Sequence, residues 1–287
     1  MPSPNSFQPP SARSHHQPDH RKQDHHKPAE KSGSDHSSTD GTWEALQRFA
    51  ADPRVRLSRL PAGGGAPANF NAVTALATGE FVKLVCGDDL LLPECLAEQV
   101  AALDAHPSAV MAASRRQVID ATGALVMGSR GLAGLTGEVD GRKAIRRTMV
   151  GGTNIFGEPA AVLLRRSVLA EVGGWDDQFP YLIDQATYCA MLLRGNLVAV
   201  PKPLAAFRVS ASSQWSEEQF NAQREHSIEF SREFAAAHPG LLSRRHLVTG
   251  AMRTRANAYG RRALYRWLDR RGRFRVGAGQ NQRGSHG

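Results

Sequence analysis

Two neighbouring aspartates, Asp88 and Asp89, have the clearest potential for chemistry in this chain. They follow the apolar residues 80–86, which predict a short buried strand, and Pro93 then begins a predicted helix. Carboxylates at the carboxyl end of a strand lie where open α/β sheets bind ligands. Two adjacent carboxylates repel each other, and a hard divalent cation is the usual partner that relieves the repulsion. The pair is therefore either a divalent-cation site or a solvated turn.

Alternating strands and helices surround this pair. The pattern predicts strands at 55–60, 80–86, 109–114, 160–164 and 197–200, and helices at 43–50, 69–78, 93–106, 140–149, 167–172 and 184–193. Such alternation indicates an α/β protein whose mostly parallel sheet is flanked by helices. The glycine-rich residues 123–137 predict a mobile loop, and residues 216–271 predict a helical extension with a break at 238–240.

Both ends of the chain have compositions that predict disorder. Residues 1–38 are rich in His, Pro, Ser and Lys with hardly any apolar side chain, so we expect a disordered tail there and a second one at 272–287. Residues 39–215 then form the main domain. The histidines of the first tail lack the regular spacing of a metal site.

The absence of membrane and secretion signals predicts the cellular location of the protein. No apolar run approaches the roughly 20 residues of a membrane helix, and no apolar signal core stands at the N-terminus. The three cysteines show no paired spacing, which is typical of a reducing compartment. We therefore expect a cytoplasmic protein.

Positive charge is concentrated in the C-terminal part. The net charge is +9, and from Arg224 onward there are 14 arginines against four acids. Such a basic segment is either a solubilising tail or a docking segment for anionic lipid head groups, nucleic acid or an acidic partner. For a docking segment we expect peripheral contact with the inner face of a membrane, and no specific nucleic-acid partner.

An ordered set of short motifs resembles the family 2 glycosyltransferases, which have the GT-A fold, a Rossmann-like fold that binds nucleotide sugars. The matching residues are Ser-Thr-Asp-Gly-Thr at 38–42, Asn71-Ala72, residues 77–82, Gly87-Asp-Asp89 with Pro93, Gly-Glu-Pro at 157–159, Arg165-Arg166, Gly-Gly-Trp-Asp at 173–176, Asp184, Leu192-Leu193 with Gly195, and Phe207-Arg208. Order and spacing both agree over roughly two thirds of the chain.

This resemblance implies an inverting glycosyltransferase of the hexosyltransferase type. It would move a sugar from a nucleoside-diphosphate sugar to a hydroxyl of a glycan, lipid-linked or protein acceptor, in glycan or polysaccharide biosynthesis. Asp88 and Asp89 match the family's acidic motif, which implies Mg²⁺ or Mn²⁺. The resemblance makes Asp89 the direct metal ligand and Asp88 a ligand or a ribose contact. A divalent cation stabilises the departing diphosphate.

Asp184 matches the family's catalytic base, at the start of a predicted helix. A base must lie within hydrogen-bond reach of the hydroxyl that it deprotonates, and its pKa should be near the working pH. The alternative is a helix N-cap, because Asp is favoured there and stabilises the first turn by about 1 kcal/mol.

Four further residues match the substrate-binding parts of the family, each with a structural alternative. Glu158 is placed for sugar or acceptor hydroxyls, or is a surface acid. Trp175, next to Asp176 in the acceptor-side segment, stacks on a sugar ring or packs in the core. Arg208 pairs with a phosphate or forms a salt bridge within the fold.

The N-terminal part departs from the family. Family members have a strand, a helix and a second strand ahead of the 38–42 motif, whereas here the His-rich segment takes their place. We expect the sheet to lack its nucleotide-side strands, and therefore a truncated, weakly active enzyme. The alternative function is a non-catalytic binding module that docks through its arginines. A Rossmann dinucleotide site is excluded because no Gly-x-Gly-x-x-Gly turn follows a strand.

Overall fold

The computed structural model describes residues 29–209 and 217–273. Most of the predicted tails, residues 1–28 and 274–287, lie outside the described residues. The strands are β1 (Lys31–Asp35), β2 (Val55–Arg59), β3 (Phe81–Val82), β4 (Leu90–Leu91), β5 (Ala109–Ile119), β6 (Leu125–Arg130), β7 (Gly137–Val139), β8 (Val162–Arg165) and β9 (Asn196–Arg208). The helices are α1 (Thr42–Gln47), α2 (Gly65–Ala75), α3 (Cys95–Ala105), α4 (Gly141–Gly151), α5 (Arg166–Glu171), α6 (Ile183–Leu192), α7 (Glu217–Ala237) and α8 (Arg244–Arg270).

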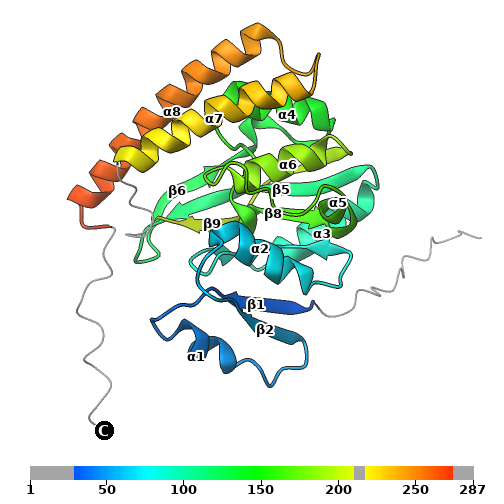
Figure 1. Cartoon of the computed structure of the whole chain (residues 1–287), viewed down its shortest axis with the longest axis vertical. Coiled ribbons are helices and arrows are strands. Elements are labelled where there is room, and N and C mark those ends of the chain that lie inside the picture. Colours follow the sequence, from blue (N-terminus) through cyan, green and yellow to red (C-terminus); the bar gives the residue numbers. More distant parts are fainter. Residues whose placement is uncertain (1–28, 210–216, 274–287) are drawn as a thin grey trace, which may run out of the picture.

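A seven-stranded sheet forms the centre of the molecule (Figure 1). Its main path is β3-β8-β5-β9-β4, with β6 paired to β5 and β7 paired to β9. Among the described strands of this sheet only β5 and β9 run parallel, and every other pair is antiparallel. The α/β architecture with flanking helices is confirmed, whereas the prediction of a mostly parallel sheet is wrong for this sheet.

Helices cover both faces of the sheet because its two central strands are buried on both sides. Ala112 and Val198 pack with Leu103 of α3 on one face. The alternate residues of the same strands, among them Met111, pack on the other face with Ile145 and other side chains of α4 and α6. Side chains that alternate between two apolar layers produce the continuous apolar runs of β5 and β9.

The first described strand differs from the sequence-based prediction of disorder up to residue 38. Lys31–Asp35 form β1, which pairs in parallel with β2 in a separate two-stranded sheet. Asp35 is buried and makes an ion pair with Arg59 at 3.1 Å. This strand has no apolar side chain, so backbone pairing and an ion pair hold it, and neither is visible in local composition.

Two other segments also differ from the predictions. The expected loop at 123–137 contains β6, which pairs with β5 across a short turn. The long apolar strand expected at 80–86 pairs only over Phe81–Val82. The predicted helical extension is confirmed as α7 and α8, and no helix among the described residues is long and apolar enough to cross a bilayer.

Candidate active site

The end of β9 holds the loop that carries Asp88 and Asp89. Asp89 is buried, and its Oδ1 accepts a hydrogen bond of 3.2 Å from the backbone N–H of Arg208. The Arg208 guanidinium donates to the carbonyl oxygens of Asp88 at 3.0 Å and of Asp120 at 3.1 Å. Arg208 therefore fixes the position of the aspartate pair through backbone carbonyls.

The carboxyl group of Asp89 is less acidic than that of an ordinary aspartate. The pKa of Asp89 is raised to about 7, chiefly by burial and also by the charges of Asp88 and Glu158, while the N–H of Arg208 and the charge of Arg116 oppose the shift. Without a cation, the protonated form of Asp89 is therefore populated near neutral pH. A divalent ion at the carboxylate would reverse this effect.

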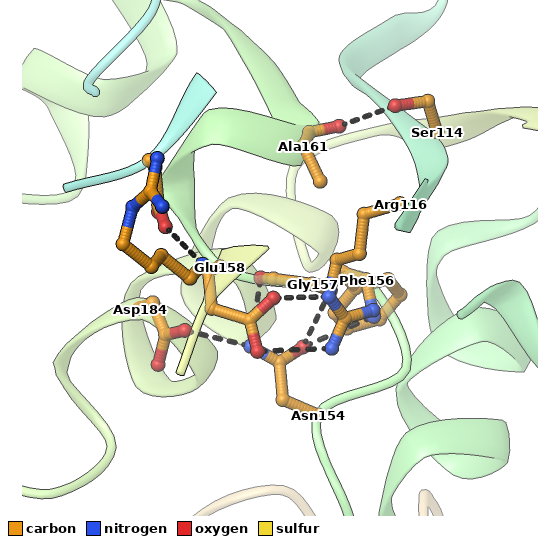
Figure 2. Close-up of polar contacts among 10 residues, drawn as sticks. Ser114, Arg116, Asn154, Phe156, Gly157, Glu158, Ala161 and Asp184 are labelled. Carbon is orange, nitrogen blue, oxygen red and sulfur yellow. Dashed lines mark hydrogen bonds and ion pairs between the residues drawn. The ribbon is translucent and has the colours of Figure 1, made fainter. Parts of the chain in front are cut away.

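The loop between α4 and β8 is built around Asn154 (Figure 2). Its Oδ1 accepts from the backbone N–H groups of Phe156 at 3.0 Å and Gly157 at 3.3 Å. Its Nδ2 donates to the carbonyl of Gly157 at 3.0 Å and to Oδ2 of Asp184 at 2.8 Å. One side chain thus closes the loop and orients the Asp184 carboxylate.

Asp184 is the second residue of α6 rather than its N-cap. The N-cap position is Leu182, which makes no side-chain capping bond, and Oδ1 of Asp184 accepts from the N–H of Gln185 at 2.7 Å. Burial raises the pKa of Asp184 to about 6, helped by the charge of Glu158 and opposed by the hydrogen bonds from Gln185 and Asn154. The carboxylate of Asp184 is therefore mostly ionised at neutral pH, and its pKa lies about one pH unit below neutrality.

Glu158 is paired with a buried arginine that sequence reasoning missed. Arg116 of β5 is 3% exposed; its Nη2 donates to Oε1 of Glu158 at 3.0 Å and its Nε contacts Oε2 (Figure 2). Burial alone would raise the pKa of Glu158, but the charge and hydrogen bonds of Arg116 outweigh it and lower that pKa. Gly157, at φ +103°, leaves the space, since a Cβ there would lie 3.1 Å from Cδ of Arg116.

The charges of four carboxylates act on one thiol. The pKa of Cys86 is raised to about 12, chiefly by burial and also by the charges of Asp89, Asp88, Asp184 and Glu158. These four acids come from the loop after β3, the loop before β8 and the start of α6. We call them the carboxylate cluster.

Trp175 and Asp176 make structural contacts that do not involve the carboxylate cluster. Trp175 is 3% exposed, donates through Nε1 to Oγ1 of Thr74 at 2.9 Å and packs against the rings of Phe70 and Tyr188. Its ring has no open face for a sugar, so the structure contradicts the stacking prediction. Oδ1 of Asp176 accepts from the N–H of Gln178 in a turn.

Two further arginines interact electrostatically with Glu158, although the described part of the structure records no ion pair between them and Glu158. The charges of Arg130 in β6 and Arg261 in α8 both interact with Glu158. Arg208, by contrast, donates its guanidinium N–H groups to the backbone carbonyls described above, which differs from the salt bridge expected as its structural alternative. An arginine just after a predicted apolar strand, such as Arg116, is a sequence signal that could have suggested a buried pair, although it does not identify Glu158 as the partner.

Residues 34–173 match the family model described as "Glycosyl transferase family 2". This segment, just under half of the chain, resembles a family 2 glycosyltransferase domain. It contains Asp88, Asp89 and Glu158 of the carboxylate cluster, and Asp184 follows eleven residues after its last matched position.

One curated protein and two solved structures resemble this chain over part of its length. The putative glycosyltransferase EpsE of Bacillus subtilis (strain 168) is 32% identical over 102 residues, which are 35% of this chain and 34% of EpsE. The crystal structure of S. aureus TarS 1–349 superposes with a TM-score of 0.52 at 20% identity, over 69% of this chain and 56% of that chain. The mannosyltransferase PcManGT from Pyrobaculum calidifontis, solved with GDP-Man and Mn²⁺, gives a TM-score of 0.48 at 17% identity, over 83% and 70% of the two chains.

The likeness to TarS confirms the GT-A-like fold expected from the motifs. The aligned part spans about a third of the length of EpsE and just over half of the TarS chain.

Proposed function

We propose that the family 2 domain transfers a sugar from a nucleoside-diphosphate sugar to an acceptor hydroxyl with inversion at the anomeric carbon. The observation that carries this proposal is the placement of Asp184, whose carboxylate is oriented by Asn154 within the carboxylate cluster and has a pKa of about 6. A base with this pKa is ionised at neutral pH and is basic enough to take a hydroxyl proton as the new bond forms.

The reaction is a single displacement. The acceptor oxygen attacks the anomeric carbon from the face opposite the diphosphate, its proton passes to Asp184, and the bond to the diphosphate oxygen breaks. Glu158, kept ionised by Arg116, is an acceptor for hydroxyl groups of the sugar or of the acceptor molecule. A hexose donor and a glycan, lipid-linked or protein acceptor are the corresponding substrates, in glycan or polysaccharide assembly.

Asp88 and Asp89 fit a Mg²⁺ or Mn²⁺ ion that arrives with the donor. No group of three or more candidate ligands is preassembled within residues 29–209 and 217–273. Mg²⁺ is commonly held by one or two carboxylates together with substrate phosphates, so the pair is sufficient. The pKa of Asp89 is raised to about 7 chiefly by burial, so a bound cation would favour its ionised form. When bound, the ion would stabilise negative charge on the departing diphosphate.

Asp89→Asn is expected to abolish metal-dependent binding of the donor nucleotide. The test is calorimetric titration with UDP or GDP in the presence of Mn²⁺, with each nucleotide alone as a reference. Second-sphere changes at metal sites already cost roughly 10–100-fold in affinity, so loss of a direct ligand should cost at least tenfold. Asp177→Asn, at an exposed aspartate, is the matched control and should bind as the wild type does. Equal binding by Asp89→Asn would refute the metal assignment, and no binding by any variant would favour a non-catalytic module.

Asn154→Ala is expected to shift the pH profile of transfer. The hydrogen bond from Asn154 favours the ionised form of Asp184, so its loss raises the pKa of Asp184 above about 6. The acidic limb of log(kcat/KM) against pH should move to higher pH. At a pH well above this limb, the loss of activity relative to the wild type should be smaller. An acidic limb that stays in place or moves to lower pH would show that Asp184 is not the group titrated.

A further inference from the structure

The outward side of α8 combines arginines with exposed apolar residues. Positions separated by three or four residues share one side of a helix. By this spacing one side of α8 contains Arg244, Arg245, Val248, Met252, Arg255, Tyr259, Arg266 and Arg270, which are all exposed. We call this set the arginine face.

The opposite side of α8 attaches the helix to the family 2 domain. Gly250, Thr254 and Leu268 are buried. Nδ2 of Asn257 donates to the carbonyl oxygens of Gly151 at 2.9 Å and Gly152 at 3.1 Å. Figure 1 shows α8 at the outer edge of the molecule, with α4, α6 and the sheet on one side of it. The arginine face is therefore directed away from α4 and borders α7, because Arg244, Val248, Met252 and Arg255 line a groove between α7 and α8.

Apolar exposure on this face is large. The exposed fractions are 54% for Val248, 65% for Met252 and 63% for Tyr259. Val248 and Met252 also line a groove between α7 and α8 together with Leu247 and Ala251. Three apolar side chains left in water on one side of a helix indicate a surface that contacts something apolar.

Charge on α8 is almost entirely of one sign. The helix contains eight arginines and a single acid, Asp269. With 27 residues it is about 40 Å long, so the positive charge extends over a long, straight edge. Mixed arginine and apolar side chains on one helix face fit the interface of an anionic bilayer, where apolar groups enter the acyl boundary and guanidinium groups contact phosphates.

We propose that the arginine face docks the protein on a membrane surface that contains anionic phospholipid. Nucleic acid fits the face less well, because phosphate contacts and base stacking leave Val248 and Met252 without a partner. The helix lies in the plane of the interface and does not span the bilayer.

The first test measures the electrostatic part by sedimentation of the full chain with phosphatidylcholine vesicles, with and without phosphatidylglycerol. Binding is expected only to the anionic vesicles and to weaken with salt. Replacing Arg255, Arg266 and Arg270 by Gln should weaken it on the order of a hundredfold, at about fivefold per cation. The matched control replaces the exposed Arg48, Arg142 and Lys143 by Gln, which removes the same charge elsewhere and should have little effect.

The second test separates a membrane from the other occupants of this face. Met252→Ser with Tyr259→Ser should weaken vesicle binding at least tenfold while circular dichroism and the thermal midpoint stay unchanged. Three results would overturn the proposal: equal vesicle binding by both arginine triples, tight binding of single-stranded RNA without vesicle binding, or dimerisation in sedimentation velocity that the serine variant abolishes.

Discussion

Asp184→Asn lowers kcat for sugar transfer by a factor on the order of 10²–10⁴, the usual contribution of a general base. Asn is nearly the same size and still accepts the N–H of Gln185 through its amide oxygen, so the fold should be retained. The amide cannot take the acceptor proton, and the defect should therefore appear in kcat rather than in donor affinity. Initial rates with a nucleotide-sugar donor, together with calorimetric donor binding, measure the two quantities separately.

The control for this prediction is Asp177→Asn, which removes an exposed carboxylate in the segment before α6. Its rate should equal that of the wild type. The wild-type rate should also fall about tenfold per pH unit below pH 6, because protonation of Asp184 removes the base, whereas the residual rate of Asp184→Asn should lack this limb. Full activity of the Asp184→Asn variant would refute the assignment of Asp184 as the general base.

Arg116→Met should destabilise the protein by about 3–5 kcal/mol at neutral pH, because removal of one partner leaves the carboxylate of Glu158 unpaired in a largely buried site. The free energy of unfolding from urea titration measures this loss, provided that the m-value stays constant. The loss should shrink in acid, since Glu158 can then be protonated; its lowered pKa in the wild type stabilises the fold only where the unfolded carboxyl group is ionised.

A double-mutant cycle isolates the pair from the general effect of a core change. Arg116→Met combined with Glu158→Gln removes both charges and should recover a large part of the loss. Arg115→Met, at the neighbouring half-buried arginine, is the matched control and should cost less than about 1 kcal/mol. A double variant no more stable than Arg116→Met would show that the pair is not coupled.

The sequence predicts the parts of the site that lie at element boundaries. Asp88-Asp89 follow an apolar run and Asp184 begins a periodic helix, so local pattern places both near the ends of elements. Arg116 and Asn154 were missed, because their partners are 42 and 30 residues away along the chain and no local pattern announces such contacts.

Contacts between residues that are distant in the sequence also explain the errors in the predicted fold. Strand direction depends on which strands pair, and the apolar run of β8 reads alike in parallel and antiparallel sheets. The glycine-rich segment at 123–137 becomes β6 only because β5 extends to Ile119 and offers a paired edge. Trp175 was assigned to a ligand because a tryptophan in a turn does not reveal Phe70 and Tyr188, which enclose it.

The contact between α4 and α8 has a mechanical consequence. Gly250 lies so close to α4 that a Cβ there would be 2.4 Å from the carbonyl oxygen of Met149, and one at Gly152 would be 2.4 Å from the nitrogen of Thr254. The backbones of α4 and α8 are in close contact at these glycines, which restricts movement of one helix relative to the other. Asn154, which orients the carboxylate of Asp184, lies two residues beyond Gly152, so the contact between α4 and α8 adjoins the loop that positions the proposed base.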